Sequence, residues 1–408
     1  MKNKITMAVV GLGQRGSGLL SSILVKQNDL EIVGVSDTYL DRTLKAKETV
    51  IKECGNTPFA STDYKEVLDK TKPDSVLVST AWEYHIEVAL YAMEKGIAVA
   101  MEVGGAYNDR EIEKLVETYE RTKTPFMFME NCCFNKEELL ATSMARKGLF
   151  GKIVHLEGAY AHDLREEIAG GNINRHYRLR NYLKRNCENY PTHEIGPIAK
   201  ILDINRGNRF VSLVSIASKS EGLKEYVNEH KDKYPELVGL DFKQGDIVTT
   251  IITCANGETV FIKLDTTLPR FYARNFTVRG TKGFYEQNTN LVFFDGDSEE
   301  WDTAKAYKER INNASKYEEE YLPAIWKNIT KEQLDAGHGG MDYFVFRAFI
   351  DCLKEGREMP IDVYDAATWM SITELSEKSI ALGGAPVYFK DYTGGKWHLR
   401  ERKDVVEF

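Results

Sequence analysis

The segment Ile5-Thr-Met-Ala-Val-Val-Gly-Leu-Gly-Gln-Arg-Gly16 decides how the first half of this chain folds. Its first six residues are apolar and β-branched enough for a strand that is buried on both faces. Gly11, Gly13 and Gly16 then follow with the spacing G-x-G-x-x-G, and a helix is expected over residues 17–26. In a dinucleotide-binding fold the first glycine permits a tight turn, the second lets backbone N–H groups approach a pyrophosphate, and the third allows close helix–strand packing. The segment therefore predicts a dinucleotide-binding loop.

Strand-like and helical stretches alternate after this loop. Further strands are expected over residues 31–36, 75–80, 97–102 and 125–130, with helices over 86–95 and 109–121. Strands separated by helices of this length form βαβ units, so the pattern predicts a parallel sheet covered on both faces. We expect a Rossmann dinucleotide-binding domain over residues 1–135.

An acidic residue closes the second expected strand. Asp37 lies 21 residues after Gly16, where a carboxylate hydrogen-bonds the ribose hydroxyls of a bound dinucleotide. The same carboxylate would repel a 2′-phosphate, so the predicted cofactor is NAD rather than NADP.

Composition and charge exclude several classes of protein. The chain has 408 residues, with 54 Lys plus Arg against 62 Asp plus Glu, which gives a net charge of −8. An acidic balance argues against nucleic acid as a partner, and no apolar run is long enough for a membrane span. The first residues lead straight into a strand and do not resemble a signal peptide, so we expect a cytoplasmic protein. No His, Asp, Glu or Cys spacing indicates a metal site.

The pattern changes after Gly151, where strands follow one another without intervening helices. Strands are expected over residues 152–162, 210–218, 246–254, 259–265, 271–280 and 291–294. We therefore expect a C-terminal α+β domain over residues 136–408, with a large, mostly antiparallel sheet. Two amphipathic helices, over 341–354 and 363–382, are expected to pack back towards the Rossmann domain. An exposed sheet face favours a homodimer or homotetramer.

Several motifs resemble the Gfo/Idh/MocA oxidoreductase superfamily. They are Lys72-Pro-Asp-Ser-Val-Leu-Val-Ser-Thr80, His85, the run from Ala89 to Gly96, and Val99-Ala-Met-Glu-Val103. In that superfamily this region lines the nicotinamide half of the cofactor. The usual Glu-Lys-Pro after the fourth strand is Glu102-Val103-Gly104 here, so the lysine that assists hydride transfer is missing.

A closer resemblance, to glycoside hydrolase family 109, accounts for the missing lysine. This family is the NAD-dependent α-N-acetylgalactosaminidase branch of the superfamily. The most specific motifs are Tyr190-Pro-Thr-His-Glu-Ile-Gly-Pro197 and Gly337-His-Gly-Gly-Met-Asp342. The motifs Trp82-Glu-Tyr-His85, Glu102-Val103, Asn131-Cys-Cys-Phe134 and Arg178-Leu-Arg-Asn181 support them. The resemblance covers nearly the whole chain.

The resemblance and the residue chemistry together predict the site. His193 is the predicted catalytic residue, since an imidazole can take a hydroxyl proton as hydride leaves the same carbon, and Tyr190 is the second candidate. The predicted cofactor-binding residues are Gly11, Gly13, Gln14, Arg15, Gly16, Asp37, Trp82, His85, Glu102, Val103, Asn131 and Tyr190. The predicted substrate-binding residues are Tyr160, Arg178, Tyr190, Pro191, Thr192, His193 and Tyr272. A tyrosine ring stacks on sugar C–H groups while its hydroxyl contacts ring oxygens.

The reaction that the resemblance implies is redox-neutral overall. NAD⁺ takes a hydride from sugar C3, a base removes the acidified C2 proton, and the aglycone leaves C1; water then adds and the hydride returns. This route does not need the carboxylate pair of ordinary glycosidases. Two alternatives stay open: a sugar or polyol dehydrogenase that uses the same glycine loop and His193, and a non-enzymatic NAD or sugar sensor on the same fold.

Overall fold

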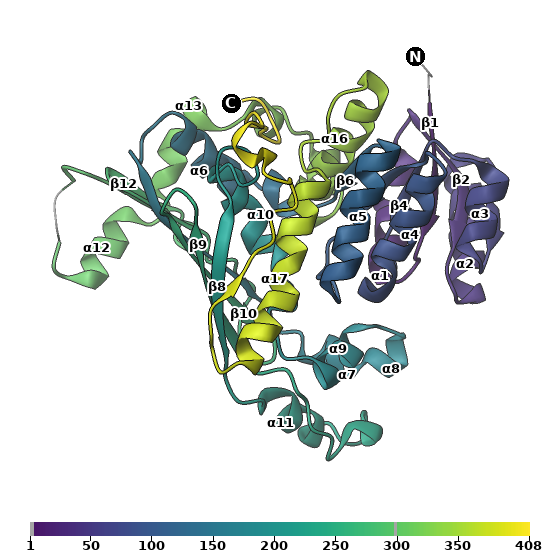
Figure 1. Cartoon of the computed structure of the whole chain (residues 1–408), viewed down its shortest axis with the longest axis horizontal. Helices are drawn as coiled ribbons and strands as arrows, with labels where there is room; N and C mark the ends of the chain where they lie inside the picture. Colours follow the sequence, from purple (N-terminus) through teal and green to yellow (C-terminus); the bar gives the residue numbers. More distant parts are fainter. Residues whose placement is uncertain (1–3, 298–299) are drawn as a thin grey trace. The chain divides into compact units, whose positions relative to one another are not determined.

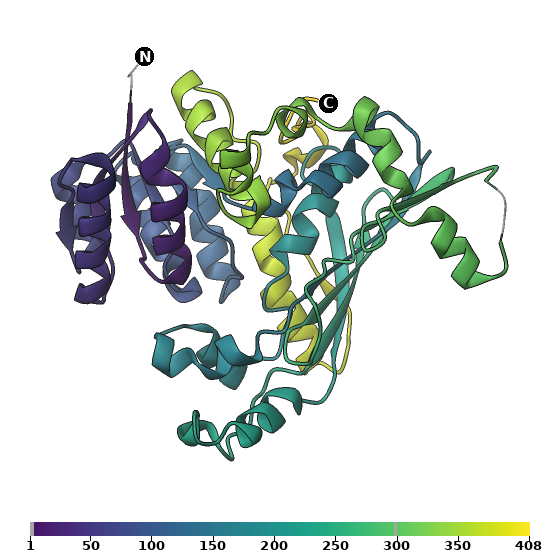
Figure 2. The same cartoon turned by 180° about the vertical axis from the view of Figure 1, so that it is seen from behind.

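The computed structural model describes residues 4–297 and 300–408, and the chain divides into two compact units. The first unit contains the residues up to Asn131 together with Ile329–Ala367. The second unit contains Cys132–Asn328 and Thr368–Phe408. Figures 1 and 2 show the chain from opposite sides, with its sequence running from purple to yellow.

The first unit is built on a six-stranded, fully parallel sheet. Its strands lie in the order β3 (Phe59–Ser61), β2 (Leu30–Ser36), β1 (Ile5–Val10), β4 (Ser75–Val78), β5 (Ala98–Met101) and β6 (Phe126–Phe128). This order is that of a dinucleotide-binding fold, with a change of direction between β1 and β4, where ligands bind. Every residue of β4 and β5 is buried, as expected for parallel strands with helices on both faces.

The helices of this unit are α1 (Gln14–Ser22), α2 (Leu40–Cys54), α3 (Tyr64–Thr71), α4 (Trp82–Glu94), α5 (Asp109–Thr122), α15 (Lys331–Leu334) and α16 (Met341–Glu355). The first begins three residues earlier than the expected 17–26, because Gly13 is its N-cap. It also ends at Ser22, and a single 3₁₀ turn over Leu24–Lys26 completes the expected stretch.

The second unit carries an eight-stranded sheet. Its strands lie in the order β13 (Leu291–Phe294), β12 (Gly283–Glu286), β11 (Thr277–Gly280), β7 (Ile153–Ala161), β10 (Thr259–Asp265), β9 (Ile247–Cys254), β8 (Phe210–Ala217) and β14 (Val387–Tyr388). Among the strand pairs that the described residues form in this sheet, only β7–β10 is parallel. Alternate residues of β9 are buried, so one face of the sheet lies on the core and the other is solvated. The predicted fold class, a Rossmann domain followed by an α+β domain with a mostly antiparallel sheet, is confirmed.

The expected strand over residues 271–280 is wrong in its first half. Phe271 is 79% exposed, and regular pairing begins at Thr277. Upstream of that point only Ala273 makes an isolated bridge, to Ala161. The aromatic residues that suggested a strand therefore belong to a loop that leads into β11.

The second unit also contains helices. They are α6 (Lys136–Arg146), α7 (Arg165–Ala169), α8 (Gly171–Asn174), α9 (Arg178–Lys184), α10 (Thr192–Ile201), α11 (Gly222–Glu229), α12 (Thr303–Arg310), α13 (Glu318–Tyr321), α14 (Ala324–Lys327) and most of α17 (Val363–Ala381). Of these helices, α10 packs on strands β7 and β10.

The compact units differ from the expected domains in two ways: the first boundary lies after Asn131 instead of after residue 135, and one C-terminal segment belongs to the first unit. Ile329–Ala367, which includes α16, groups with the N-terminal residues instead of with the rest of 136–408. The reason is local bonding inside the first unit. Arg347 and Lys354 on α16 form ion pairs with Asp29 at 2.8 and 3.0 Å, and the Phe128 N–H of β6 donates to the Ile361 carbonyl at 3.0 Å.

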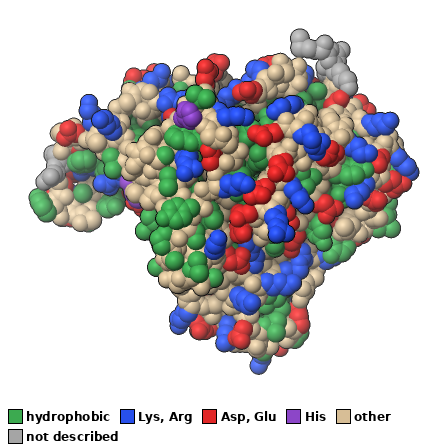
Figure 3. Space-filling model, viewed as in Figure 1, with side chains coloured by type: hydrophobic (Ala, Val, Ile, Leu, Met, Phe, Trp, Pro, Cys, Tyr) green, Lys and Arg blue, Asp and Glu red, His purple; other side chains and the backbone are tan. Residues whose placement is uncertain are grey.

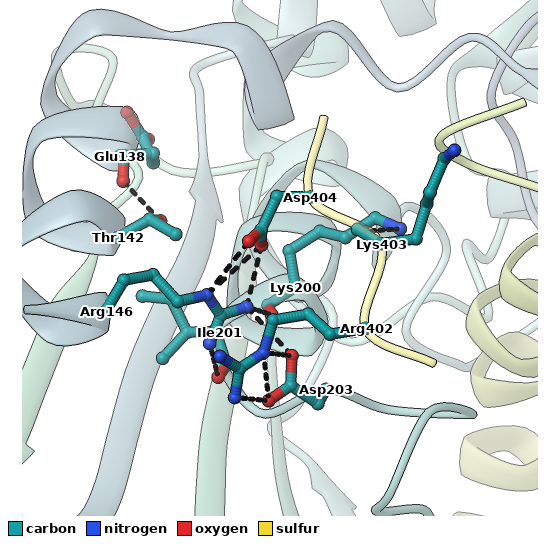
Figure 4. A network of polar contacts seen from close by, with 9 residues as sticks. All are labelled: Glu138, Thr142, Arg146, Lys200, Ile201, Asp203, Arg402, Lys403 and Asp404. Carbon is teal, nitrogen blue, oxygen red and sulfur yellow. Dashed lines mark hydrogen bonds and ion pairs between the residues drawn. The ribbon is translucent and has the colours of Figure 1, made fainter. Parts of the chain in front are cut away.

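A cluster of charged groups fixes the C-terminal end of α10 in the second unit (Figure 4). Arg146 on α6 donates to the Lys200 and Ile201 carbonyls at 2.6 and 3.0 Å. The same guanidinium pairs with Asp203 and Asp404, each at 2.8 Å. These bonds satisfy carbonyls that the helix leaves without internal partners and hold the helix that begins at Thr192.

The surface in Figure 3 carries Lys and Arg side chains interspersed with Asp and Glu. Within residues 4–297 and 300–408, each helix is too short or too polar to cross a lipid bilayer.

Candidate functional site

The glycine loop of the first unit has the geometry that its sequence predicts. Gly11 has φ +94°, and a Cβ there would lie 2.4 Å from the backbone of Ser79. A Cβ on Gly16 would lie 1.9 Å from the Gly11 carbonyl oxygen, so the loop closes only with glycine at both positions. A Cβ on Gly13 would meet nothing nearer than the Arg42 guanidinium at 3.7 Å. The loop is therefore tightly packed on its strand side and open at Gly13.

The N-terminus of α1 lies in this loop and suits an anion. Gly13 is the N-cap, and among the described residues no side chain caps the helix and no acidic residue occupies its first turn. The first N–H groups of the helix and the positive end of its dipole are thus left for a ligand phosphate. Gln14, in this first turn, is exposed.

Asp37 lies at the end of β2 beside the loop and is 8% exposed. Its carboxylate accepts the Leu12 N–H at 2.7 Å and the Tyr39 N–H at 2.9 Å, and Arg42 lies 3.8 Å away. A carboxylate has about four acceptor sites. Asp37 therefore ties the glycine loop to the next turn and keeps capacity for a ribose hydroxyl.

The remaining predicted cofactor residues of this unit lie at the carboxyl ends of β4 and β5 and just after β6. Trp82 begins α4, is 5% exposed, and packs so closely on Gly104 that a Cβ there would lie 2.3 Å from its ring. This contact explains the glycine at position 104. Glu102, Val103 and Asn131 are all buried.

His85 is also buried, and it acts within the fold as a hydrogen-bonding group. Its Nε2 lies 3.0 Å from the Thr80 carbonyl. Burial lowers the pKa of His85 to about 4, against the opposing effect of hydrogen bonds to the Thr80 and Glu102 backbones. The imidazole is therefore neutral in the folded protein at physiological pH.

The neutral state of His85 predicts a pH-dependent stability. Between pH 6.5 and about 4 the unfolded chain binds a proton at this histidine that the folded chain does not. The free energy of unfolding should therefore fall as the pH falls through this window, by about 3 kcal/mol in total. Urea unfolding at several pH values should show a smaller fall for His85→Gln, and the half-exposed His155→Gln should behave as wild type. An unchanged fall in His85→Gln would contradict the assignment.

The second unit brings the predicted substrate residues together. The Tyr160 ring, at the end of β7, lies 4.6 Å from the Tyr190 ring and 5.5 Å from the His193 imidazole, between centroids. Tyr190 and His193 are 4.7 Å apart, and Tyr272 lies 6.4 Å from Tyr160. The Arg178 guanidinium lies 5.0 Å from the Tyr190 ring centroid. These five residues form one cluster, which we call the tyrosine–histidine cluster.

Local structure positions His193 at the start of α10. Pro191 is the N-cap and Thr192 the first residue of this helix, and both are buried. Pro191 has a fixed φ and lacks an N–H, which suits the position before a helix. His193 is half-buried, so its imidazole keeps an accessible edge within the cluster.

Burial keeps the Tyr160 phenol protonated, and an ion pair holds the arginine. Burial raises the pKa of Tyr160 to about 12, so its hydroxyl stays protonated at neutral pH. Arg178 is buried and pairs with Glu167 through Nε at 2.6 Å. The cluster therefore combines hydroxyl donors, one imidazole and a held guanidinium.

Sequence reasoning missed three residues next to this cluster. The His162 ring lies 5.1 Å from Tyr272, and its Nδ1 lies 3.4 Å from the Tyr160 hydroxyl. Arg274 donates to the Tyr272 hydroxyl at 3.2 Å and pairs with Glu138 at 2.7 Å. The alternation of side-chain direction along β7, continued past its end, could have indicated His162. No local pattern could have indicated the pair between Arg274 and Glu138, because these residues are 136 positions apart.

A parallel sheet with a glycine loop in one unit and a large, mostly antiparallel sheet in the other define the Gfo/Idh/MocA class of oxidoreductase folds. The dinucleotide-binding fold of the first unit is confirmed by a family model for the NAD-binding Rossmann fold of an oxidoreductase family, which matches residues 5–129. Myo-inositol 2-dehydrogenase from Lactobacillus plantarum has this fold, with a TM-score of 0.65 at 15% identity over 95% of this chain and 100% of that chain. Scyllo-inositol dehydrogenase from Lactobacillus casei, solved with NAD(H) and scyllo-inositol, aligns with a TM-score of 0.65 at 14% identity over 94% of this chain and 99% of that one.

Sequence comparison gives the particular family. The model for the C-terminal domain of glycosyl hydrolase 109 matches residues 134–399. A glycosyl hydrolase family 109 protein of Stenotrophomonas maltophilia is 37% identical over 99% of this chain and 92% of its own length. An α-N-acetylgalactosaminidase of Tannerella forsythia is 35% identical over 96% of this chain and 87% of its own. The chain belongs to glycoside hydrolase family 109, as its motifs predict.

Proposed function

We propose that this chain is an NAD-dependent glycosidase that cleaves α-N-acetylgalactosaminides. The observation that carries the proposal is the pairing, in one chain, of a dinucleotide loop with a tyrosine–histidine cluster suited to a sugar. Membership of family 109 supports glycoside hydrolysis. The substrate is proposed from relatives named α-N-acetylgalactosaminidase, at 35% identity in Tannerella forsythia and 32% in Shewanella oneidensis.

The first unit fits NAD. The space at Gly13 and the uncapped helix N-terminus suit a pyrophosphate, and the buried Asp37 suits the adenosine ribose and disfavours a 2′-phosphate. When bound, NAD supplies a reversible hydride acceptor for a sugar carbon.

The second unit supplies the acid–base and binding groups of the proposed reaction. The half-buried imidazole of His193 would take the proton of the sugar hydroxyl that is oxidised, and Tyr190, beside it, is the second proton-transfer group. The protonated Tyr160 hydroxyl donates a hydrogen bond, and Tyr272 offers a ring face to sugar C–H groups. The Arg178 guanidinium, held by Glu167, provides a fixed positive group for a sugar oxygen.

A panel of nitrophenyl glycosides, with NADH absorbance followed in the same cuvette, tests this proposal. We expect nitrophenol release from the α-N-acetylgalactosaminide without net accumulation of NADH. Accumulation of one NADH per sugar consumed would show a net dehydrogenase instead. No release from any glycoside of the panel would overturn the glycosidase.

The proposed function bears on the cellular location and the oligomeric state of the protein. We propose a cytoplasmic enzyme that acts on a small glycoside. We also propose that copies associate as a homodimer or homotetramer, supported by the exposed apolar residues Ile216 and Ile251 on the solvated face of the large sheet.

A further inference from the structure

Arg15 lies inside the glycine loop, where a guanidinium is expected to bind a phosphate of the dinucleotide. Its side chain instead points at two carboxylates from other elements of the same unit. It donates to Asp342, at the start of α16, through Nη1 at 2.7 Å and Nη2 at 2.9 Å. It donates to Glu102, after β5, through Nε at 3.2 Å and Nη2 at 3.1 Å.

Counting donors shows what Arg15 has left for a ligand. A guanidinium has five N–H groups. The two carboxylates take four of them, one from Nε, two from Nη2 and one from Nη1. The last N–H is on Nη1, which lies 3.2 Å from Nδ1 of His338. Because that Nδ1 also contacts Asp342, at most this one N–H is left for a ligand. A bidentate phosphate contact needs two parallel N–H groups, which this arrangement does not leave.

Asp342 is the centre of this network. Besides Arg15, it accepts from Asn131 at 2.8 Å and contacts the Nδ1 of His338 at 2.7 Å. Its side chain is only 2% exposed, and its pKa is held well below the usual range by hydrogen bonds and charge from His338 and Arg15 that outweigh desolvation. An ionised Asp342 makes Nδ1 of His338 a donor, so the carboxylate receives four hydrogen bonds for its four acceptor sites.

The backbone is built around the same carboxylate. Residues 337–340 all have positive φ, including +42° at His338, a conformation that is unfavourable for a non-glycine residue. A Cβ on Gly337 would lie 2.8 Å from an Asp342 oxygen, so this turn follows the carboxylate closely. A strained turn around a saturated buried carboxylate is a rigid support for the groups bonded to it.

We propose that Arg15 is a positioning residue and not a phosphate ligand: it joins the glycine loop to Asp342 and Glu102, and Asp342 thereby sets the affinity for the dinucleotide. The inference rests on the proposed NAD-binding function. Asp342 acts through Arg15 and Asn131, two of the predicted cofactor residues, without itself contacting the cofactor.

Equilibrium dialysis of the full chain against NAD⁺ tests this role in four variants: Arg15→Gln, Arg15→Lys, Asp342→Asn, and Arg15→Gln combined with Asp342→Asn. Each single glutamine or asparagine substitution is expected to weaken NAD⁺ binding by about tenfold or more. The double variant should bind NAD⁺ no more weakly than either single variant, because both substitutions remove the same ion pair between Arg15 and Asp342. Arg15→Lys should be as weak as Arg15→Gln, since an ammonium cannot bridge two carboxylates in a fork.

A phosphate ligand would give the opposite pattern. Arg15→Lys would then keep most of the affinity, and Asp342→Asn would bind NAD⁺ as wild type; either result overturns the inference. Arg347→Gln is the matched control, because it breaks another ion pair of α16, to Asp29, that does not involve the loop. If circular dichroism shows that Asp342→Asn does not fold, the comparison of Arg15→Lys with Arg15→Gln still distinguishes a positioning residue from a phosphate ligand. Failure of the wild-type chain to bind NAD⁺ would overturn the proposed function itself.

Discussion

Replacing His193 with alanine is expected to lower kcat for the cleaved glycoside by about 10²–10⁴-fold, the range that one positioned proton-transfer group contributes. The imidazole is half-buried beside Tyr160 and Tyr190, where the proposed mechanism places the sugar hydroxyl. The substitution removes the proposed base and leaves the first unit unchanged, so NAD⁺ binding should persist.

Two measurements separate a catalytic effect from damage to the fold. Nitrophenol release gives kcat and KM, and equilibrium dialysis gives NAD⁺ binding on the same preparation. His155→Ala is the control, since this histidine lies on β7 of the same unit and bonds Thr259 at 2.8 Å, away from the cluster. An alanine variant of His193 with kcat within a few-fold of wild type would remove it from the mechanism.

The second large effect is expected from Gly16→Ala. The new Cβ would lie 1.9 Å from the Gly11 carbonyl oxygen and 2.6 Å from the Ser79 hydroxyl. The first contact is with backbone, so α1 must shift away from β1, and overpacking of this kind costs about 1–3 kcal/mol. We expect a lower free energy of unfolding together with loss of NAD⁺ binding, because the shift moves the N–H groups at the start of α1.

Gly18→Ala is the matched control on the same helix. The position is exposed, and a Cβ there meets no described atom within 4 Å. Alanine should raise the free energy of unfolding by about 0.5–1 kcal/mol through helix propensity and leave NAD⁺ binding unchanged. Urea unfolding and dialysis measure both quantities. Equal behaviour of the two alanine variants would contradict the role assigned to Gly16.

Local patterns in the sequence predicted the fold class because each long strand is a distinct apolar or alternating run. Phe59–Ser61 escaped prediction because it is only three residues long and half-buried. The run from Phe271 was overestimated because its aromatic residues serve a loop, and one of them, Tyr272, joins the tyrosine–histidine cluster.

The sequence could indicate candidate site residues that lie close together in the chain. It could not indicate contacts between residues that are distant in the chain. The glycine spacing and Asp37 indicate their positions through local turn geometry. The pairing of Arg15 with Asp342 joins residues 327 positions apart, and no local period encodes such a contact. The loop alone predicted Arg15 as a cofactor-binding residue and gave no sign of the carboxylates that the fold brings to it.

The central claim is that the aglycone leaves by elimination after a base has removed the proton on sugar C2. Hydrolysis of nitrophenyl α-N-acetylgalactosaminide in heavy water tests this claim most directly, with the released sugar analysed by mass spectrometry and proton NMR. Elimination through C2 predicts deuterium at C2 of the product. A product that keeps its original hydrogen at C2 while nitrophenol is released would contradict it.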